Sequence, residues 1–181
     1  QKRIEFIRKF IPVFNRYYHT ISEGNETVEL IYQSQLNEGD FAQQLKDNRY
    51  KDHRVQFTTI GTHKDDLILN LDGTPIKRIG SQGQQKTYLV SLKFAQFEFL
   101  REIKETAPLL LLDDVFDKLD ANRVRQILKL VGHDSFGQIF ITHTSMDRMK
   151  SILEELGLGH TLFDVQKGKV KVIENSGEIT E

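Results

Sequence analysis

Apolar side chains recur every three or four positions at the start of the chain, which is the spacing of one face of an α-helix. They are Ile4, Ile7, Ile11, Phe14, Tyr18 and Ile21, and they predict a helix that runs through about residue 20. Pro12 lies inside this stripe. Because proline removes a backbone hydrogen bond from a helix interior, we expect a helix packed on a domain rather than a long regular coiled coil.

The next segment changes to the two-residue period of β-strands. Residues 27–33 alternate as in a strand, whereas residues 38–53 are rich in charge and predict a surface helix. Residues 55–61 and 66–73 predict two strands in succession, and the second closes on the turn pair Asp72-Gly73. Together these segments predict an antiparallel ribbon.

From residue 81 onward the pattern is that of longer, alternating helices and strands. Apolar positions from Leu89 to Ile103 mark one face of a long helix. Residues 108–114 hold four consecutive leucines, which predicts a strand buried on both faces of a parallel sheet. The predicted fold class is therefore α/β. Helices at 121–131 and 146–156 and strands at 138–142, 161–165 and 169–173 complete the order, and the residues after Asn175 are expected to fray.

Composition narrows the functional classes. The chain has 181 residues, 38% hydrophobic and 28% charged, as in one soluble domain or one domain with an appendage. No apolar run approaches the roughly 18 residues that span a bilayer, and no signal-peptide pattern opens the chain, so we expect a cytoplasmic protein. Zero cysteines exclude disulfides, thiolate nucleophiles and Cys-ligated metals. Because 25 Lys and Arg balance 26 Asp and Glu, any contact with DNA would use a local patch.

The stretch SQGQQ, residues 81–85, stands at the start of the predicted long helix. Ser81 and Gln84 fit a capping box, in which each side chain binds the backbone N–H of the other residue. The box does not explain Gly83, which costs roughly 1 kcal/mol relative to alanine inside a helix. The alternative is that an anion such as phosphate approaches the backbone closely at this helix N-terminus.

Paired acids, Asp113 and Asp114, follow the leucine strand. Ligands of open α/β sheets bind outside the carboxyl ends of the strands, so one carboxylate is placed to serve Mg²⁺ while its neighbour orients a water. A structural acid at the end of the strand is the alternative. Two adjacent acids repel one another near a buried strand end unless a cation is present, which favours the functional interpretation.

Two further polar residues follow the predicted strands. Asp120 stands where the helix at 121–131 needs an N-cap, and capping alone accounts for it. His143 follows the strand at 138–142, on the sheet edge predicted for the paired acids, where it is placed to reach a terminal phosphate. A surface or capping histidine is the alternative, with Thr144 or Ser145 as caps of the next helix.

Two charged clusters are less specific. Residues 61–66, GTHKDD, lack a convincing set of metal-ligand partners, and a charged loop explains them. Lys77, Arg78 and Lys86 flank residues 81–85 and are placed either to meet phosphate or to form a solvated face.

The order of these motifs resembles the C-terminal half of an ABC-type ATPase head. In that comparison residues 81–85 match the signature motif, LLLLDD the Walker B strand, DKLD the D-loop and His143 the switch histidine. The segments GTHKDD, SQGQQK and LLLLDDVFDKLD resemble sequences of the RecF family of bacterial DNA replication and repair proteins, which is related to SMC and Rad50. The resemblance is close over residues 55–145. Family members usually have proline in place of Thr62 and arginine in place of Lys64.

The resemblance implies a domain organisation. Residues 55–181 would form part of a P-loop NTPase-like sheet flanked by helices, and residues 1–54 a helical arm with one strand. No G-x-x-x-x-G-K-[ST] motif, which cradles phosphate, occurs in the chain. We therefore expect a C-terminal fragment that is inactive alone.

The resemblance also implies roles for single residues. Asp113 would hold Mg²⁺, Asp114 would orient or deprotonate the attacking water, and His143 would contact the γ-phosphate. Asp120 would lie at a dimer interface. The residues that would contact ATP held by the other subunit are Ser81, Gln82, Gly83, Gln84 and Gln85.

The resemblance to full-length family members also implies binding partners for this protein. The expected protein binds ATP, dimerises with it, and binds DNA at single-strand/double-strand junctions, working with RecO and RecR to load recombinase during repair and the SOS response. Three alternatives stay open: a fragment of an SMC or Rad50 head, a non-catalytic interaction module, and a metal-dependent phosphoesterase or nuclease centred on Asp113 and Asp114.

Overall fold

The computed structural model describes residues 2–104, 106–132 and 136–176. The chain divides into two compact units, Gln1–Ala95 and Gln96–Glu181, and the division falls inside one helix, α4 (Gln82–Lys104). The domain boundary predicted between residues 54 and 55 concerns the domains of the family and stays a prediction. The expected fraying after Asn175 concerns residues that, from 177 onward, lie outside the described part.

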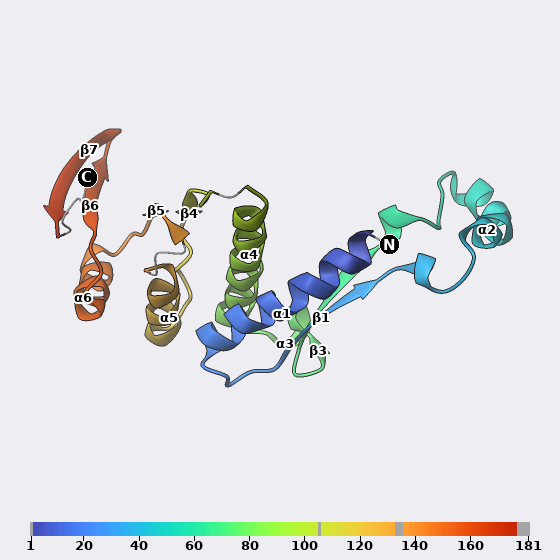
Figure 1. Cartoon of the computed structure of the whole chain (residues 1–181), viewed down its shortest axis with the longest axis horizontal. Helices are drawn as coiled ribbons and strands as arrows, with labels where there is room; N and C mark the ends of the chain where they lie inside the picture. Colours follow the sequence, from blue (N-terminus) through green and yellow to red (C-terminus); the bar gives the residue numbers. More distant parts are fainter. Residues whose placement is uncertain (1, 105, 133–135, 177–181) are drawn as a thin grey trace. The chain divides into compact units, whose positions relative to one another are not determined.

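The first unit contains a three-stranded antiparallel sheet in the order β1-β2-β3. Leu30 pairs with Leu69, and Gln33 pairs with Asp66 at the far end of the β1–β2 ribbon (Figure 1). The predicted turn pair Asp72-Gly73 connects β2 to β3, and both residues have the positive φ that such tight hairpins require. The elements are α1 (Lys2–Ser22), β1 (Val28–Gln33), η1 (Gln35–Asn37), α2 (Phe41–Val55), η2 (Thr62–Lys64), β2 (Asp66–Leu71), β3 (Thr74–Pro75) and α3 (Ile76–Ile79).

Aromatic side chains from α1 and α4 form the core of this unit. Phe14 on α1 lies 4.7 Å from Tyr88 on α4 between ring centroids, and Tyr17 meets Phe94 edge to face. The Tyr88 hydroxyl donates to the Glu29 carbonyl at 2.7 Å, which ties α4 to β1. Helix α1 is therefore packed on a domain, as Pro12 suggested. Phe10 and Tyr17 are also buried, although the predicted stripe did not include them.

The strand predicted at 55–61 is wrong. Helix α2 continues to Val55, and Gln56 ends it in the left-handed conformation. The N–H and the hydroxyl of Thr59 both donate to Asp52, so this N–H is not available for a β-ladder. Strand β2 pairs instead with β1 and β3 on its two sides.

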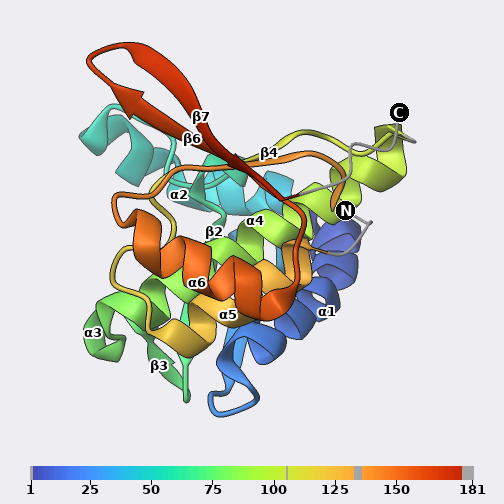
Figure 2. The same cartoon turned by 90° about the vertical axis from the view of Figure 1, so that its left-hand side faces the viewer.

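The second unit contains a two-stranded parallel sheet and a separate hairpin. Strands β4 and β5 pair in parallel, with Leu112 opposite Ile141. Figure 2 shows α5 and α6 next to each other, where Arg125 and Glu155 form an ion pair of 2.9 Å. The elements are β4 (Leu110–Leu112), α5 (Ala121–Val131), β5 (Ile139–Ile141), α6 (Met146–Leu156), β6 (Thr161–Gln166) and β7 (Lys169–Asn175).

The expectation that the leucine strand is buried on both faces is wrong for this chain. Leu110 and Leu112 are buried, but Leu111 is 69% exposed, and its partner in the register, Phe140, is exposed too. Residues paired in register project to the same face of a sheet, so one face of the β4–β5 pair is covered and the other is open. A buried strand needs cover on both faces, and this short sheet has it on one.

Strands β6 and β7 form an antiparallel hairpin around Lys167 and Gly168, which both have positive φ. The register places Phe163 opposite Val172 and Val165 opposite Val170, and all four side chains are exposed. One face of the hairpin is therefore an uncovered apolar surface. Among the residues that the structure describes, no helix is both long enough and apolar enough to cross a membrane.

Candidate functional site

The predicted site residues lie in both compact units. Ser81–Gln85 belong to the first unit, whereas Asp113, Asp114, Asp120 and His143 belong to the second.

The capping box predicted at the start of α4 is confirmed. The Ser81 N–H donates to Oε1 of Gln84 at 2.8 Å, and the Gln84 N–H donates to Oγ of Ser81 at 3.2 Å. The Gln84 amide also donates to Glu26 at 2.9 Å, which links the helix start to the loop before β1. Two of the free N–H groups at this helix start therefore have partners, and the turn is held in place before any ligand binds.

Gly83 lies in the first turn of α4 with its carbonyl accepting from the Thr87 hydroxyl at 2.9 Å. It is not among the residues of positive φ, so backbone conformation does not require glycine here. Ser81, Gln82 and Gln85 around it are exposed. The backbone conformation therefore does not explain the glycine, and the close approach of a ligand stays a prediction.

The paired acids follow directly on β4, which ends at Leu112. Both carboxylate residues are exposed, and they lie beyond the strand, so strand alternation does not set their directions. Asp114 adopts φ 47, in the left-handed region that costs most side chains roughly 1–2 kcal/mol. Aspartate adopts this region more readily than most side chains, so the turn at Asp114 is formed at little cost.

Thr142, at the end of β5, holds both acids and was missed from the sequence. Its hydroxyl donates to Oδ1 of Asp113 at 2.5 Å and accepts the Asp114 N–H at 3.0 Å. Its own N–H donates to the Leu112 carbonyl at 3.0 Å. The sequence carried no separate signal for Thr142. It lies beside Asp113 because the parallel register pairs Leu112 with Ile141.

His143 follows Thr142, so the ends of the two paired strands bring it to the sheet edge that carries the acids, as expected. Its half-buried ring meets Phe116 edge to face, with 6.1 Å between ring centroids. Phe116 is fully buried, so the histidine ring packs against a side chain that the core holds in place. Its Nδ1 atom is shielded from solvent and has no hydrogen-bond partner among the described residues, which is uncommon for a buried polar atom unless a ligand or water completes it.

Asp120 caps α5, as predicted. Its carboxylate accepts the Arg123 N–H at 2.9 Å and the Arg123 side chain at 3.1 Å. The loop from the acids to this cap is anchored by the buried side chains of Phe116 and Leu119. Ser145 is the N-cap residue of α6, but its side chain makes no capping hydrogen bond.

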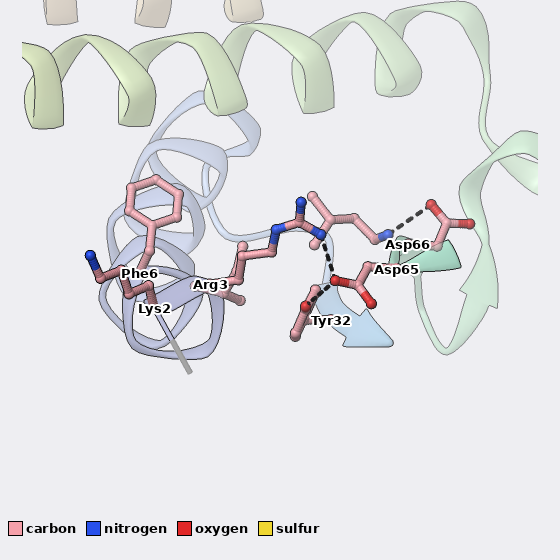
Figure 3. A pocket seen from close by; sticks show the side chains of 8 residues that line it. Lys2, Arg3, Phe6, Tyr32, Asp65 and Asp66 are labelled. Atoms are coloured by element: carbon pink, nitrogen blue, oxygen red, sulfur yellow. Dashed lines mark hydrogen bonds and ion pairs between the residues drawn. The ribbon is translucent and has the colours of Figure 1, made fainter. Parts of the chain in front are cut away.

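The GTHKDD segment serves a structural network in the first unit, beside a hollow of about 520 Å³ (Figure 3). Arg3 from α1 and Tyr32 from β1 converge on the Asp65 carboxylate at 2.5 and 2.6 Å, and this side chain is only 5% exposed. These interactions, led by the Tyr32 hydrogen bond and joined by Ser34, lower the pKa of Asp65. His63 binds the Thr58 carbonyl at 2.8 Å.

The paired acids offer few protein ligands for a metal ion. Within residues 2–104, 106–132 and 136–176, no three His, Cys, Asp or Glu side chains gather closely enough to hold a metal ion. Asp113 is exposed and uses one carboxylate oxygen for Thr142. This arrangement fits Mg²⁺ in a phosphate complex, because Mg²⁺ is commonly held by one or two carboxylates together with phosphate oxygens and water.

Comparison with known proteins gives close relatives, although no family model matches the chain. The DNA replication and repair protein RecF of Bacteroides fragilis is 48% identical over 174 residues, which are 96% of this chain and 47% of that protein. RecF of Phocaeicola vulgatus is 50% identical over 171 residues, 94% of this chain and 46% of the relative. The chain thus spans about half the length of the curated relatives it matches.

Solved structures agree with these relatives. The recombination mediator protein RecF-ATPrS in the RecFOR pathway matches with a TM-score of 0.69 and 29% identity, over 95% of this chain and 46% of that one. An Smc head bound to the C-winged helix domain of ScpA matches with a TM-score of 0.59 and 18% identity, over 97% of this chain and 45% of that one, which shows a shared fold. The α/β class and its likeness to ATPase heads are therefore confirmed.

Proposed function

Since the chain belongs to the RecF family and matches about half the length of its members, we propose that it supplies part of an ATP-dependent DNA-binding protein of replication and repair. The observation that carries this proposal is the pair of acids at the end of β4, held by Thr142 at the edge where α/β sheets bind ligands. The similarity to RecF favours this function over a nuclease or phosphoesterase centred on the same acids.

In this proposal Asp113 holds Mg²⁺ through its exposed carboxylate. The Thr142 hydroxyl fixes Asp113 by occupying Oδ1. The ion, when bound, neutralises charge on the phosphates. Because phosphoryl transfer depends mostly on positioning and charge neutralisation, the main task of Asp113 and Thr142 is to keep one carboxylate in one place.

Asp114 orients or deprotonates the water that attacks the γ-phosphate. Its left-handed backbone and the hydrogen bond from its N–H to Thr142 fix the direction in which the side chain leaves the turn. His143 contacts the γ-phosphate from the end of β5. The unpartnered Nδ1 atom and the brace from Phe116 support a ring that is held ready for a ligand.

The start of α4 acts on ATP bound by a second subunit. Ser81–Gln85 present an exposed, capped helix N-terminus with a glycine in its first turn, which is suited to close contact with phosphate. Asp120 lies at the interface of the two subunits and couples their sites. ATP-driven dimerisation would therefore assemble two composite sites, each with residues from both subunits.

The partners proposed for the whole protein are those of the family. They are DNA at single-strand/double-strand junctions, RecO and RecR, and the process is recombinase loading in DNA repair and the SOS response. What supports this step is the identity of 48% to a DNA replication and repair protein RecF.

A chimaera tests the proposed function. This chain would replace the 174 matching residues of the Bacteroides fragilis relative, and ATP hydrolysis and ATP-dependent dimerisation would be measured. We expect turnover and dimerisation in the chimaera. Asp114→Asn should lower turnover by at least about a hundredfold while sparing ATP binding, since removing one positioned catalytic group costs that much. Ser81→Arg should abolish dimerisation with ATP and leave the fold intact.

Two results would contradict the proposal. One is full turnover in the Asp114→Asn chimaera. The other is metal-dependent cleavage of phosphodiester bonds by the 181-residue chain alone, which would make the paired acids a nuclease centre.

A further inference from the structure

Helix α2 carries an outward face of basic and aromatic side chains that the proposed ATP site does not use. Figure 1 shows α2 at the end of the β1–β2 ribbon opposite to β3, where the chain crosses from Gln33 to Asp66. None of its residues is buried. A helix that buries nothing is not kept in place by a core, so the composition of its exposed face needs another explanation.

The inner side of α2 makes the contacts that hold the helix. The Gln44 amide donates to the Gln35 carbonyl at 2.9 Å, and the Asp52 carboxylate accepts two hydrogen bonds from Thr59 at 2.8 and 2.6 Å. The residues on this side are half-buried, Leu45 and Asn48 included. The opposite side is therefore left free to meet a partner.

Tyr50 lies at the centre of that opposite side and is 80% exposed. Lys46 and Arg54 stand four residues before and after it, so all three share one face of the helix. Arg49 and Lys51 flank Tyr50 on its two sides. Its ring and hydroxyl make no aromatic contact or hydrogen bond with a described residue, so packing does not explain an aromatic side chain here.

Acids among the described residues offset only part of the charge of this face. Lys46, Arg49, Lys51 and Arg54 form no ion pair with a described residue. Of the two acids of α2, Asp52 faces Thr59 on the inner side, whereas Asp47 lies three residues before Tyr50 on the same exposed face. One carboxylate therefore stands among four cations, and the face keeps an excess of positive charge. The chain as a whole carries a net charge of -1, so the positive charge here is local.

Resting on the proposed function and deepening it, we propose that this face of α2 is a nucleic-acid contact surface: Lys46, Arg49, Lys51 and Arg54 bind phosphates, and Tyr50 stacks on an unpaired base. Lys46 and Arg54 are eight positions apart, about 12 Å along the helix, which is long enough to meet more than one phosphate of a strand. Aromatic stacking among phosphate-binding cations is how single strands are bound without sequence preference.

Fluorescence anisotropy on the 181-residue chain tests this surface without ATP, with a labelled oligothymidylate of about 20 nucleotides and a duplex of the same length. Four phosphate contacts predict a slope of about −2.8 for log affinity against log salt on the single strand, so affinity should fall about fiftyfold between roughly 50 and 200 mM salt. The double variant Lys46→Glu/Arg54→Glu should halve that slope. The matched control is Arg8→Glu/Lys9→Glu, which makes the same charge change on exposed positions of α1 and should leave binding unchanged.

Tyr50 gives a second readout. Tyr50→Ala should weaken single-strand binding by about fivefold or more and leave duplex binding unchanged, because only an unpaired base offers a face to stack on. Tyr50→Phe keeps the ring and should behave as the unchanged chain.

Several results would contradict the proposal that α2 contacts nucleic acid. They are no salt-dependent DNA binding by the unchanged chain, equal losses in the α2 and α1 variants, and binding to vesicles of phosphatidylcholine and phosphatidylglycerol in place of DNA. None of them bears on ATP turnover in the chimaera, so failure of this surface and failure of the proposed function are distinguished.

Discussion

The hydroxyl of Thr142 is predicted to control the geometry of the paired acids, and Thr142→Val removes it with little change of shape. Two hydrogen bonds are lost, one to the Asp113 carboxylate and one from the Asp114 N–H. Fully buried, bonds of these types would contribute roughly 2–4 kcal/mol together. All three residues are exposed, so water replaces part of each bond, and we expect a loss of about 1–2 kcal/mol in the local stability of this turn.

Hydrogen exchange of the Asp114 amide measures this loss directly, because that N–H is the donor to Thr142. A loss of about 1–2 kcal/mol corresponds to exchange that is about 5–30 times faster in Thr142→Val. In the chimaera the same substitution should lower ATP turnover more than ATP binding, since it loosens the acids without removing them. Thr142→Ser keeps the hydroxyl and should match the unchanged chain in both assays.

Unchanged exchange at Asp114 together with unchanged turnover in Thr142→Val would refute this account of the site. Equal effects of the serine and valine variants would also count against it, because they would assign the effect to the methyl group.

Three further predictions address the capped helix, the Asp65 network and the hairpin. Gly83→Ala should stabilise the isolated chain against urea by up to about 1 kcal/mol, since Gly83 is helical, yet lower ATP-dependent dimerisation of the chimaera. Because the pKa of Asp65 is lowered in the folded chain, its stabilising contribution is present above its unfolded pKa of about 3.9 and is lost as pH falls through the lower folded value. Urea titrations should therefore show a weaker acid dependence for Asp65→Asn, and an identical pH profile would contradict the network. The exposed apolar face of the β6–β7 hairpin should favour self-association, and Val165→Thr/Val170→Thr should reduce it because less apolar surface is exposed. Sedimentation velocity measures the change, and an unchanged sedimentation coefficient would contradict this prediction.

Much of the local structure could be predicted because it depends on residues within one or two turns. Three such features are confirmed, and each depends on residues a few positions apart: the apolar stripe of α1, the capping box of Ser81 and Gln84, and the cap at Asp120. The strand predicted at 55–61 failed because periodicity does not report that Asp52 takes the Thr59 N–H from the ladder.

Relations between distant residues could not be predicted in the same way. Arg3 and Asp65 are 62 positions apart, and Asp113 and Thr142 are 29 apart. Such pairs depend on the path of the chain and on strand register. The acids were found because two carboxylates after a leucine strand are unusual, whereas a threonine is too common for its type alone to mark it.

The sequence by itself determined the order of helices and strands, the family, and the residue types at the candidate ATP site. The tertiary structure decided that one threonine holds both acids, that Asp65 belongs to a structural network, and that the basic face of α2 is left uncovered. The physical reason is that periodicity and capping are local properties of the backbone, whereas hydrogen-bond partners and exposure are set only when distant segments pack.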